Sequence, residues 1–168
     1  MIKFLMSSYI VLLGVGVGII GALGIIVAPV IFHPENVLGD GVLNHFQSGL
    51  LMSTIFVRFN LFLNALILIV MGTEFFIQIS RKIGCLVDKL AVIGVLSSAL
   101  FFSFYLTPKV LGFQTQGMSV VNTPEFQTVH YLSEVDFKML MASLIMLAFV
   151  RLSRFFDVLG TTSAGCQR

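Results

Sequence analysis

The first long apolar run of the chain, residues 9–32, constrains the fold more than any other feature. It reads YIVLLGVGVGIIGALGIIVAPVIF, with five glycines and no charged residue. A helix of about 20 apolar residues spans the hydrocarbon core of a bilayer. The apolar part of a cleaved signal peptide is shorter, about 7–15 residues. We therefore expect this run to be retained as a membrane-spanning helix.

The composition supports a membrane protein. Of the 168 residues, 57% are hydrophobic and 11% are charged, whereas soluble domains carry about 25% charged residues. The net charge is only +2, and the basic residues form no patch of the kind that binds nucleic acid. Cys85 and Cys166 are far apart and match no metal-binding or redox spacing. We expect one membrane domain, residues 1–168, whose partner is the lipid bilayer and not nucleic acid.

Four segments are apolar enough to span a membrane, at about residues 8–32, 50–79, 90–107 and 131–152. Because short loops join them, sequential helices should be antiparallel, and the predicted fold is an all-α, four-helix transmembrane bundle. The fourth helix should begin near Pro124, outside the hydrocarbon. There, Thr123-Pro124-Glu125 combines an N-cap residue, a proline at the first helical position and an acid in the first turn.

The basic residues predict the orientation of the bundle. With four spans, both termini and the loop at 80–89 share one side. That side carries seven basic residues and the other side three, which favours cytoplasmic termini because basic residues are enriched in cytoplasmic segments. All three histidines then lie on the outer side. The compact chain, without an organelle-targeting segment, favours a bacterial inner membrane.

Small residues define one face of the first helix. Gly14, Gly18, Gly21 and Ala28 share this face, and Pro29 follows it. The Gly-x-x-x-Gly spacing lets two helix backbones approach closely. We interpret the face as packing within the bundle. A dimer interface and the wall of a pathway are the alternatives.

Polar residues form a stripe on the second span, in which Asn60, Asn64 and Glu74 project in a similar direction. Polar groups in hydrocarbon are costly unless they face protein or water. One interpretation is hydrogen bonding between helices by the two asparagines, with Glu74 near the head groups. The other is a polar track for a proton, an ion or a small solute.

The outer side carries a candidate metal site. His130 and Glu134 are one helical turn apart, where side chains meet, and His33 and His45 lie on the same side of the membrane. Imidazole and carboxylate ligands suit zinc, copper or iron. The four residues match no tight ligand spacing such as H-E-x-x-H. A simple ion pair between Glu134 and Lys138 is the other explanation of this turn.

Catalytic motifs are absent from the sequence, which contains no G-x-S-x-G elbow and no P-loop. We expect a non-enzymatic membrane protein, without a resident cofactor, that packs and interacts through its glycine face with a second copy or another membrane protein. The alternative is transport, or the handling of a metal or haem, by the outer-side histidines.

Several short motifs occur in an order that resembles one known family. They are Ala28-Pro29-Val30-Ile31-Phe32, Gly49 with Ile55-Phe56, Tyr105-Leu106-Thr107-Pro108-Lys109, and Phe126-x-x-Val129-His130-x-x-Ser133. In this order they resemble the transmembrane-protein-205-like family, a four-helix membrane domain of unknown function. The resemblance implies a four-span bundle with Pro29, Phe32, Pro108, His130 and Ser133 as motif residues, and it implies no reaction. It also implies a loose link to drug or metal tolerance and to trafficking. The chain departs from the family pattern by lacking tryptophan in the first span.

Overall fold

A computed structural model of the protein describes residues 2–39, 41–80, 86–121 and 123–159. Cys85 and Cys166 lie outside these ranges. In the described residues all regular structure is helical, and η denotes a π-helix. The elements are α1 (Ile2–Ala22), η1 (Leu23–Val27), α2 (Ala28–Phe32), α3 (Glu35–Leu38), α4 (His45–Ser80), α5 (Leu86–Phe101), η2 (Phe102–Leu106), α6 (Thr107–Gln114), α7 (Met118–Val121) and α8 (Pro124–Leu159).

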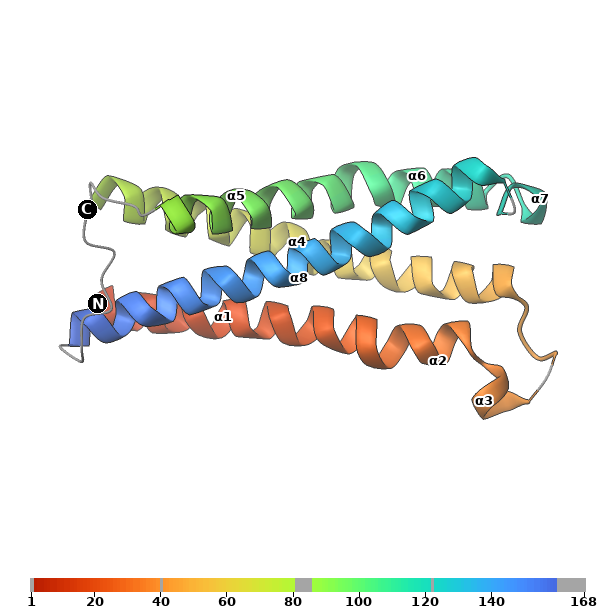
Figure 1. The fold of residues 1–168 in the computed structure, drawn as a ribbon, viewed down its shortest axis with the longest axis horizontal. Coiled ribbons are helices and arrows are strands. Elements are labelled where there is room, and N and C mark those ends of the chain that lie inside the picture. Colours follow the sequence, from red (N-terminus) through yellow and green to blue (C-terminus); the bar gives the residue numbers. More distant parts are fainter. Residues whose placement is uncertain (1, 40, 81–85, 122, 160–168) are drawn as a thin grey trace.

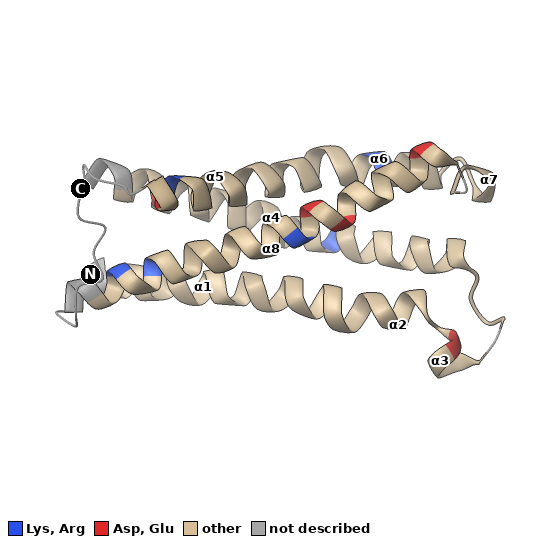
Figure 2. Ribbon diagram, in the orientation of Figure 1, with Lys and Arg blue, Asp and Glu red and all other residues tan. Residues whose placement is uncertain are grey.

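These elements form four long antiparallel rods: α1 with η1 and α2, then α4, then α5 with η2 and α6, and finally α8 (Figure 1). Four helices of the described chain are long and apolar enough to cross a membrane, over Phe4–Phe32, His45–Ile77, Leu86–Gln114 and Pro124–Phe156. The predicted all-α bundle of four membrane helices is therefore confirmed. Long stretches of the rods carry no charged residue (Figure 2).

Two prolines lie inside rods and do not end them. Pro29 and Pro108 each follow a five-residue π-helix, η1 and η2, at the second position of the next helix. A proline has no N–H, and its ring crowds the carbonyl four residues earlier. The wider turn of a π-helix relieves that crowding. The third rod consequently continues to Gln114, beyond the predicted end at residue 107.

The core runs along the centre of the bundle, with Leu13, Leu63, Val95 and Leu144 at most 1% exposed. The outside is apolar as well. Phe104 on the third rod is 68% exposed, for example. An apolar surface around an apolar core is what a bilayer requires, because lipid tails and core side chains are equally apolar.

The rods do not stay equally close along their length. We call the end where α1 begins and α8 ends the Tyr9 end, and the opposite end the His130 end. Helix α8 packs against α1 and α5 and, farther toward the His130 end, against α6, whereas α2 packs against α4. Figure 1 shows α8 and α1 side by side at the Tyr9 end and diverging toward the His130 end.

Candidate binding cavity

A cavity of about 750 Å³ occupies the His130 end of the bundle. Its volume falls within the range of roughly 300–1,000 Å³ that is usual for small-molecule sites. All four rods contribute to its wall. Most of that wall is apolar, and six phenylalanines belong to it: Phe32, Phe46, Phe56, Phe102, Phe126 and Phe137.

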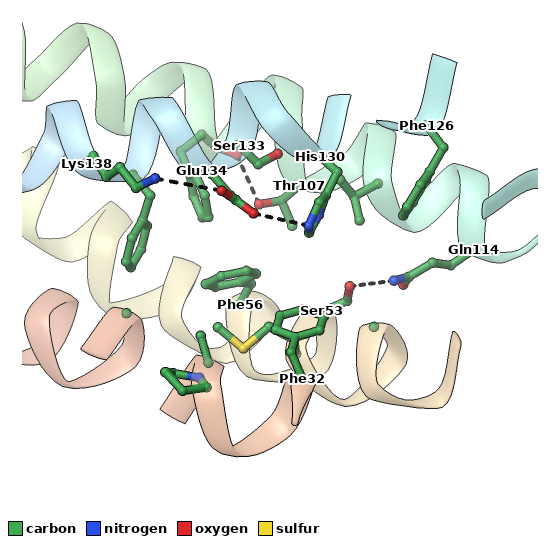
Figure 3. Close-up of a pocket in the computed structure, with 18 of the residues that line it drawn as sticks. Phe32, Ser53, Phe56, Thr107, Gln114, Phe126, His130, Ser133, Glu134 and Lys138 are labelled. Atoms are coloured by element: carbon green, nitrogen blue, oxygen red, sulfur yellow. Dashed lines mark hydrogen bonds and ion pairs between the residues drawn. The ribbon is translucent and has the colours of Figure 1, made fainter. Parts of the chain in front are cut away.

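Charged side chains of α8 border one part of the cavity (Figure 3). Nε2 of His130 lies 3.4 Å from Oε1 of Glu134, and Nζ of Lys138 lies 3.7 Å from Oε2 of Glu134. A normal N–H···O hydrogen bond is shorter, at about 2.7–3.2 Å. The side chains of Glu134 and Lys138 are 52% and 73% exposed. These three groups are therefore only loosely paired and remain accessible to a ligand.

Other polar groups of the wall, hydroxyls and amides, come from α4, α6 and α8, and those on α4 and α6 are buried. Nε2 of Gln114 on α6 donates to Oγ of Ser53 on α4 over 2.7 Å (Figure 3), and both residues are buried. Oε1 of Gln114 has no hydrogen-bond partner among the described residues. The hydroxyls of Thr107 and Ser133 donate within their own rods, to the carbonyl oxygens of Phe102 and Val129 over 3.0 Å and 2.8 Å. Such bonds within a rod leave these hydroxyls committed to the backbone.

The candidate metal ligands lie near one another but do not meet at one point. His33 pairs with Glu35, with Nδ1 and Oε1 3.2 Å apart. The Phe32 ring contacts the rings of both His45 and His130, with centroid distances of 5.9 Å and 6.0 Å. Among the described residues, no three His, Cys, Asp or Glu side chains are grouped closely enough to hold a metal ion.

A buried ion-pair network that was not predicted from the sequence lies at the Tyr9 end. Nε of Arg151 donates to Oε1 of Glu74 over 2.8 Å, and Nη2 donates to Oε2. The Tyr9 hydroxyl also donates to Oε1 of Glu74, over 2.9 Å. Glu74 is 2% exposed. Glu74 therefore faces protein inside the bundle, where Arg151 and Tyr9 are its partners.

The network continues to a second carboxylate on α5. Nη1 of Arg151 lies 3.7 Å from Oδ1 of Asp88, and Nη2 of Arg154 donates to Oδ2 of Asp88. The five side chains join α1, α4, α5 and α8. Charges removed from water are costly unless they are paired and hydrogen-bonded, and here two acids balance two arginines. The sequence did contain a signal for this network, because the two acids and the two arginines lie at matching depths of antiparallel spans.

The remaining polar-stripe residues have different surroundings. Oδ1 of Asn64 accepts a 2.8 Å hydrogen bond from Oγ of Ser103 in η2. Asn60 is half-buried, and its Oδ1 has no partner among the described residues. Asn64 and Glu74 thus hold different rods together, each at its own level.

The glycine face also differs from the expectation. A Cβ atom built on Gly14, Gly18 or Gly21 would meet no described atom within 4 Å, whereas one on Gly16 would lie 3.2 Å from Cδ2 of Leu66. The prediction that Gly14 and Gly18 pack inside the bundle is therefore wrong. On this part of the rod, Gly16 is the close-packed glycine. Farther along the rod, Gly21, Ala28 and Pro29 line the cavity.

Short motifs from four separate segments converge on this cavity. Its wall includes Pro29 and Phe32 from α2, Phe56 from α4, Thr107 from α6, and Phe126, His130 and Ser133 from α8. These residues belong to the motifs whose order carries the family resemblance. They lie far apart in sequence, and the fold gathers them around one space.

The sequence profile of a family described as a domain of unknown function (DUF4149) matches residues 11–119, which is more than half of the chain. No curated protein and no solved structure matches the chain.

Proposed function

We propose that this chain, which belongs to the DUF4149 family, is a multi-pass membrane protein that binds a small amphipathic molecule in the cavity at its His130 end. The observation that supports the proposal is the convergence of four sequence motifs on one aromatic cavity. The wall is mostly apolar, with Glu134, Lys138 and His130 at one part of it. A ligand with an apolar body and a polar head fits this division.

The proposed activity is binding or transport without chemical change. Two hydroxyls of the cavity wall, those of Thr107 and Ser133, donate to backbone carbonyls. A nucleophilic hydroxyl would instead be activated by an adjacent base. The polar groups of the wall are thus arranged to hold a ligand.

A solvatochromic aminonaphthalene dye with an alkyl chain tests the proposal. Purified protein should bind the dye with a saturable rise in fluorescence. A Gly24→Leu variant places a side chain in the cavity, where a Cβ atom would meet Phe137 at an ordinary contact distance of 3.7 Å, and it should lose saturable binding. Gly18→Leu, on the same rod outside the cavity, is the matched control. Equal dye binding by both variants would contradict the proposal.

The orientation and location are part of the proposal. The excess of basic residues in the terminal segments and the loop at 80–89 supports cytoplasmic termini. With that orientation the cavity lies toward the outer face of the membrane, which we propose to be a bacterial inner membrane. The order of the motifs around Pro29, Pro108 and His130 supports a relationship with the transmembrane-protein-205-like family.

Self-association is a second candidate function. Gly14 and Gly18 have the Gly-x-x-x-Gly spacing, and the space outside both is open within the described structure. A second copy, or another membrane helix, could approach closely there. This surface is separate from the cavity.

Metal or haem handling is the remaining alternative. Its support is the His130–Glu134 pair, together with His45, whose ring also contacts the Phe32 ring. Metal analysis and an absorption spectrum of the protein after metal or haem loading test it. Stoichiometric binding that is lost in His130→Ala would favour it.

A further inference from the structure

Building on the proposed function, we infer that the cavity takes up an acyl chain of a membrane phospholipid whose head group carries both a phosphate and an ammonium group. Three features support this inference: the depth of the cavity in the bilayer, its opening toward lipid, and the charges at its polar part.

The polarity of the cavity follows that of a bilayer. Glu74 and Arg151 mark one level of the bundle at the Tyr9 end. Glu134 lies about 26 Å from that level along α8, at about 1.5 Å per residue. Because the hydrocarbon core is about 30 Å thick, Glu134 lies close to the opposite head-group layer when the ion-pair network lies close to the first. Phe137 and Met141 line the cavity one and two turns deeper, at the level of lipid tails.

The cavity is open at the side that faces lipid. Ile25 in η1 lines the cavity and is nevertheless 73% exposed. On the facing rod, Glu134 also lines the cavity and is exposed. At this end of the bundle, α8 has diverged from the first rod (Figure 1). An acyl chain can therefore pass from the bilayer into the cavity without crossing water.

The charges match a head group with both signs. Lys138 offers three N–H donors to a phosphate, and the Glu134 carboxylate accepts from an ammonium group. Both are only loosely paired with each other, at 3.7 Å. The Phe32 and Phe126 rings beside His130 favour a nearby cation through their π faces. A head group with only negative charge would satisfy Lys138 but would repel Glu134.

Tryptophan fluorescence provides a sharp test, because the chain contains no tryptophan. Phe137→Trp places one fluorophore in the cavity wall, and Phe32→Trp is a second cavity position in case the first variant misfolds. Phe149→Trp, at an α8 residue that is 66% exposed to lipid, is the matched control. Each variant is placed in phosphatidylglycerol vesicles with increasing amounts of phosphatidylethanolamine or phosphatidylglycerol brominated on its acyl chains, since bromine quenches tryptophan on contact.

Brominated phosphatidylethanolamine should quench the cavity tryptophan at about a tenfold lower mole fraction than brominated phosphatidylglycerol, the difference expected for one charged contact. The control tryptophan should respond equally to both lipids. Adding Glu134→Gln and Lys138→Met should abolish the preference. Soluble glycerophosphoethanolamine should not relieve the quenching, because it lacks the chain; relief would assign the site to a free head group and overturn the inference.

Two other outcomes would overturn it. One is equal quenching of the cavity tryptophan by both lipids. The other is quenching no stronger than that of the Phe149→Trp control. Either result rejects phospholipid as the ligand. The proposed function stands if the dye still binds to the protein and Gly24→Leu abolishes that binding. If specific dye binding were also absent, both the phospholipid inference and the proposed function would be rejected.

Discussion

Glu74 and Arg151 form a two-point ion pair across 77 residues of sequence, and both side chains are 3% exposed. The pair joins the second and fourth rods, and Tyr9 adds the first rod through its hydroxyl. Ion pairs and a tyrosine hydrogen bond thus hold the rods together at one end of the bundle. At the other end α8 leaves the first rod, and the cavity takes the place of core packing. The two ends therefore differ, because ion pairs join the rods at one end and a cavity lies between them at the other.

Arg151→Ala should strongly destabilise the protein, because it leaves the Glu74 charge buried without its main partner. Removing one partner of a buried pair costs about 3–5 kcal/mol of unfolding free energy. Tyr9→Phe removes one neutral donor to the carboxylate and should cost about 1–2 kcal/mol. Unfolding in mixed micelles, followed by circular dichroism, measures both. Lys138→Ala is the control, and it should change stability by less than about 1 kcal/mol because the Lys138 pair is exposed.

Replacing both charges should cost less than replacing one. In Glu74→Met/Arg151→Leu neither residue leaves an unpaired charge, and apolar replacements of buried ion pairs are often close to neutral. Asp88 retains Arg154 as a partner. The double variant should therefore unfold at higher denaturant than Arg151→Ala. If the double variant were the less stable protein, the pair would contribute more than mutual neutralisation.

Glycines on the first rod should respond differently according to the side that they face. Gly16→Leu drives a side chain into Leu66 and Leu144, and overpacking of this kind costs about 1–3 kcal/mol. Gly14→Leu and Gly18→Leu should leave the stability of the bundle unchanged. If the outer face associates, those two variants should instead lower the dimer fraction seen by crosslinking in membranes. If the Gly14 and Gly18 variants lowered the stability of the monomer, these two glycines would pack inside the bundle after all.

The contact between α5 and α8 depends on Gly94. A Cβ atom at this position would lie 2.5 Å from Oγ and 3.1 Å from Cβ of Ser143. Gly94→Ala should have the smaller effect, because the Ser143 hydroxyl can rotate away and only the tight 3.1 Å contact with its Cβ remains. Gly94→Val should cost about 1–3 kcal/mol through its added methyl groups. Ser143→Gly in the Gly94→Val background should restore part of the loss. Thermal unfolding in detergent compares the stability of the variants. If Ser143→Gly restored none of the loss, a neighbour other than Ser143 would limit the space at position 94.

The four rods were predictable because length and apolar composition alone identify a membrane helix. The start of α8 was also predictable, since Thr123 and Pro124 form a local signal, and Oγ1 of Thr123 accepts from the N–H of Phe126. The continuation of the third rod through Pro108, beyond the predicted end at residue 107, was not. It depends on π-helical turns, which short sequence patterns do not reveal.

The inward face of each rod was harder to predict, because lipid and core are both apolar. The glycine pattern identified a face of small residues on the first rod, but it gave no sign of which face points inward. The actual close contact lies at Gly16. Glu74 was interpreted from its own helix alone, as a member of the polar stripe on the second span, and Arg151 only contributed to the count of basic residues. Their pairing required the relative depth of two antiparallel rods.

The remaining prediction concerns orientation. Arg151 and Arg154 are engaged by Glu74 and Asp88, yet five other basic residues remain on the predicted cytoplasmic side against three on the outer side, so the bias is retained. A membrane-impermeant maleimide applied to intact cells should leave Cys85 and Cys166 unlabelled. In a Cys85→Ser/Cys166→Ser background, Val37→Cys should be labelled from outside, because Val37 in α3 is 68% exposed at the His130 end. Labelling of the native cysteines in intact cells, with protection of position 37, would invert the orientation and place the cavity toward the cytoplasm.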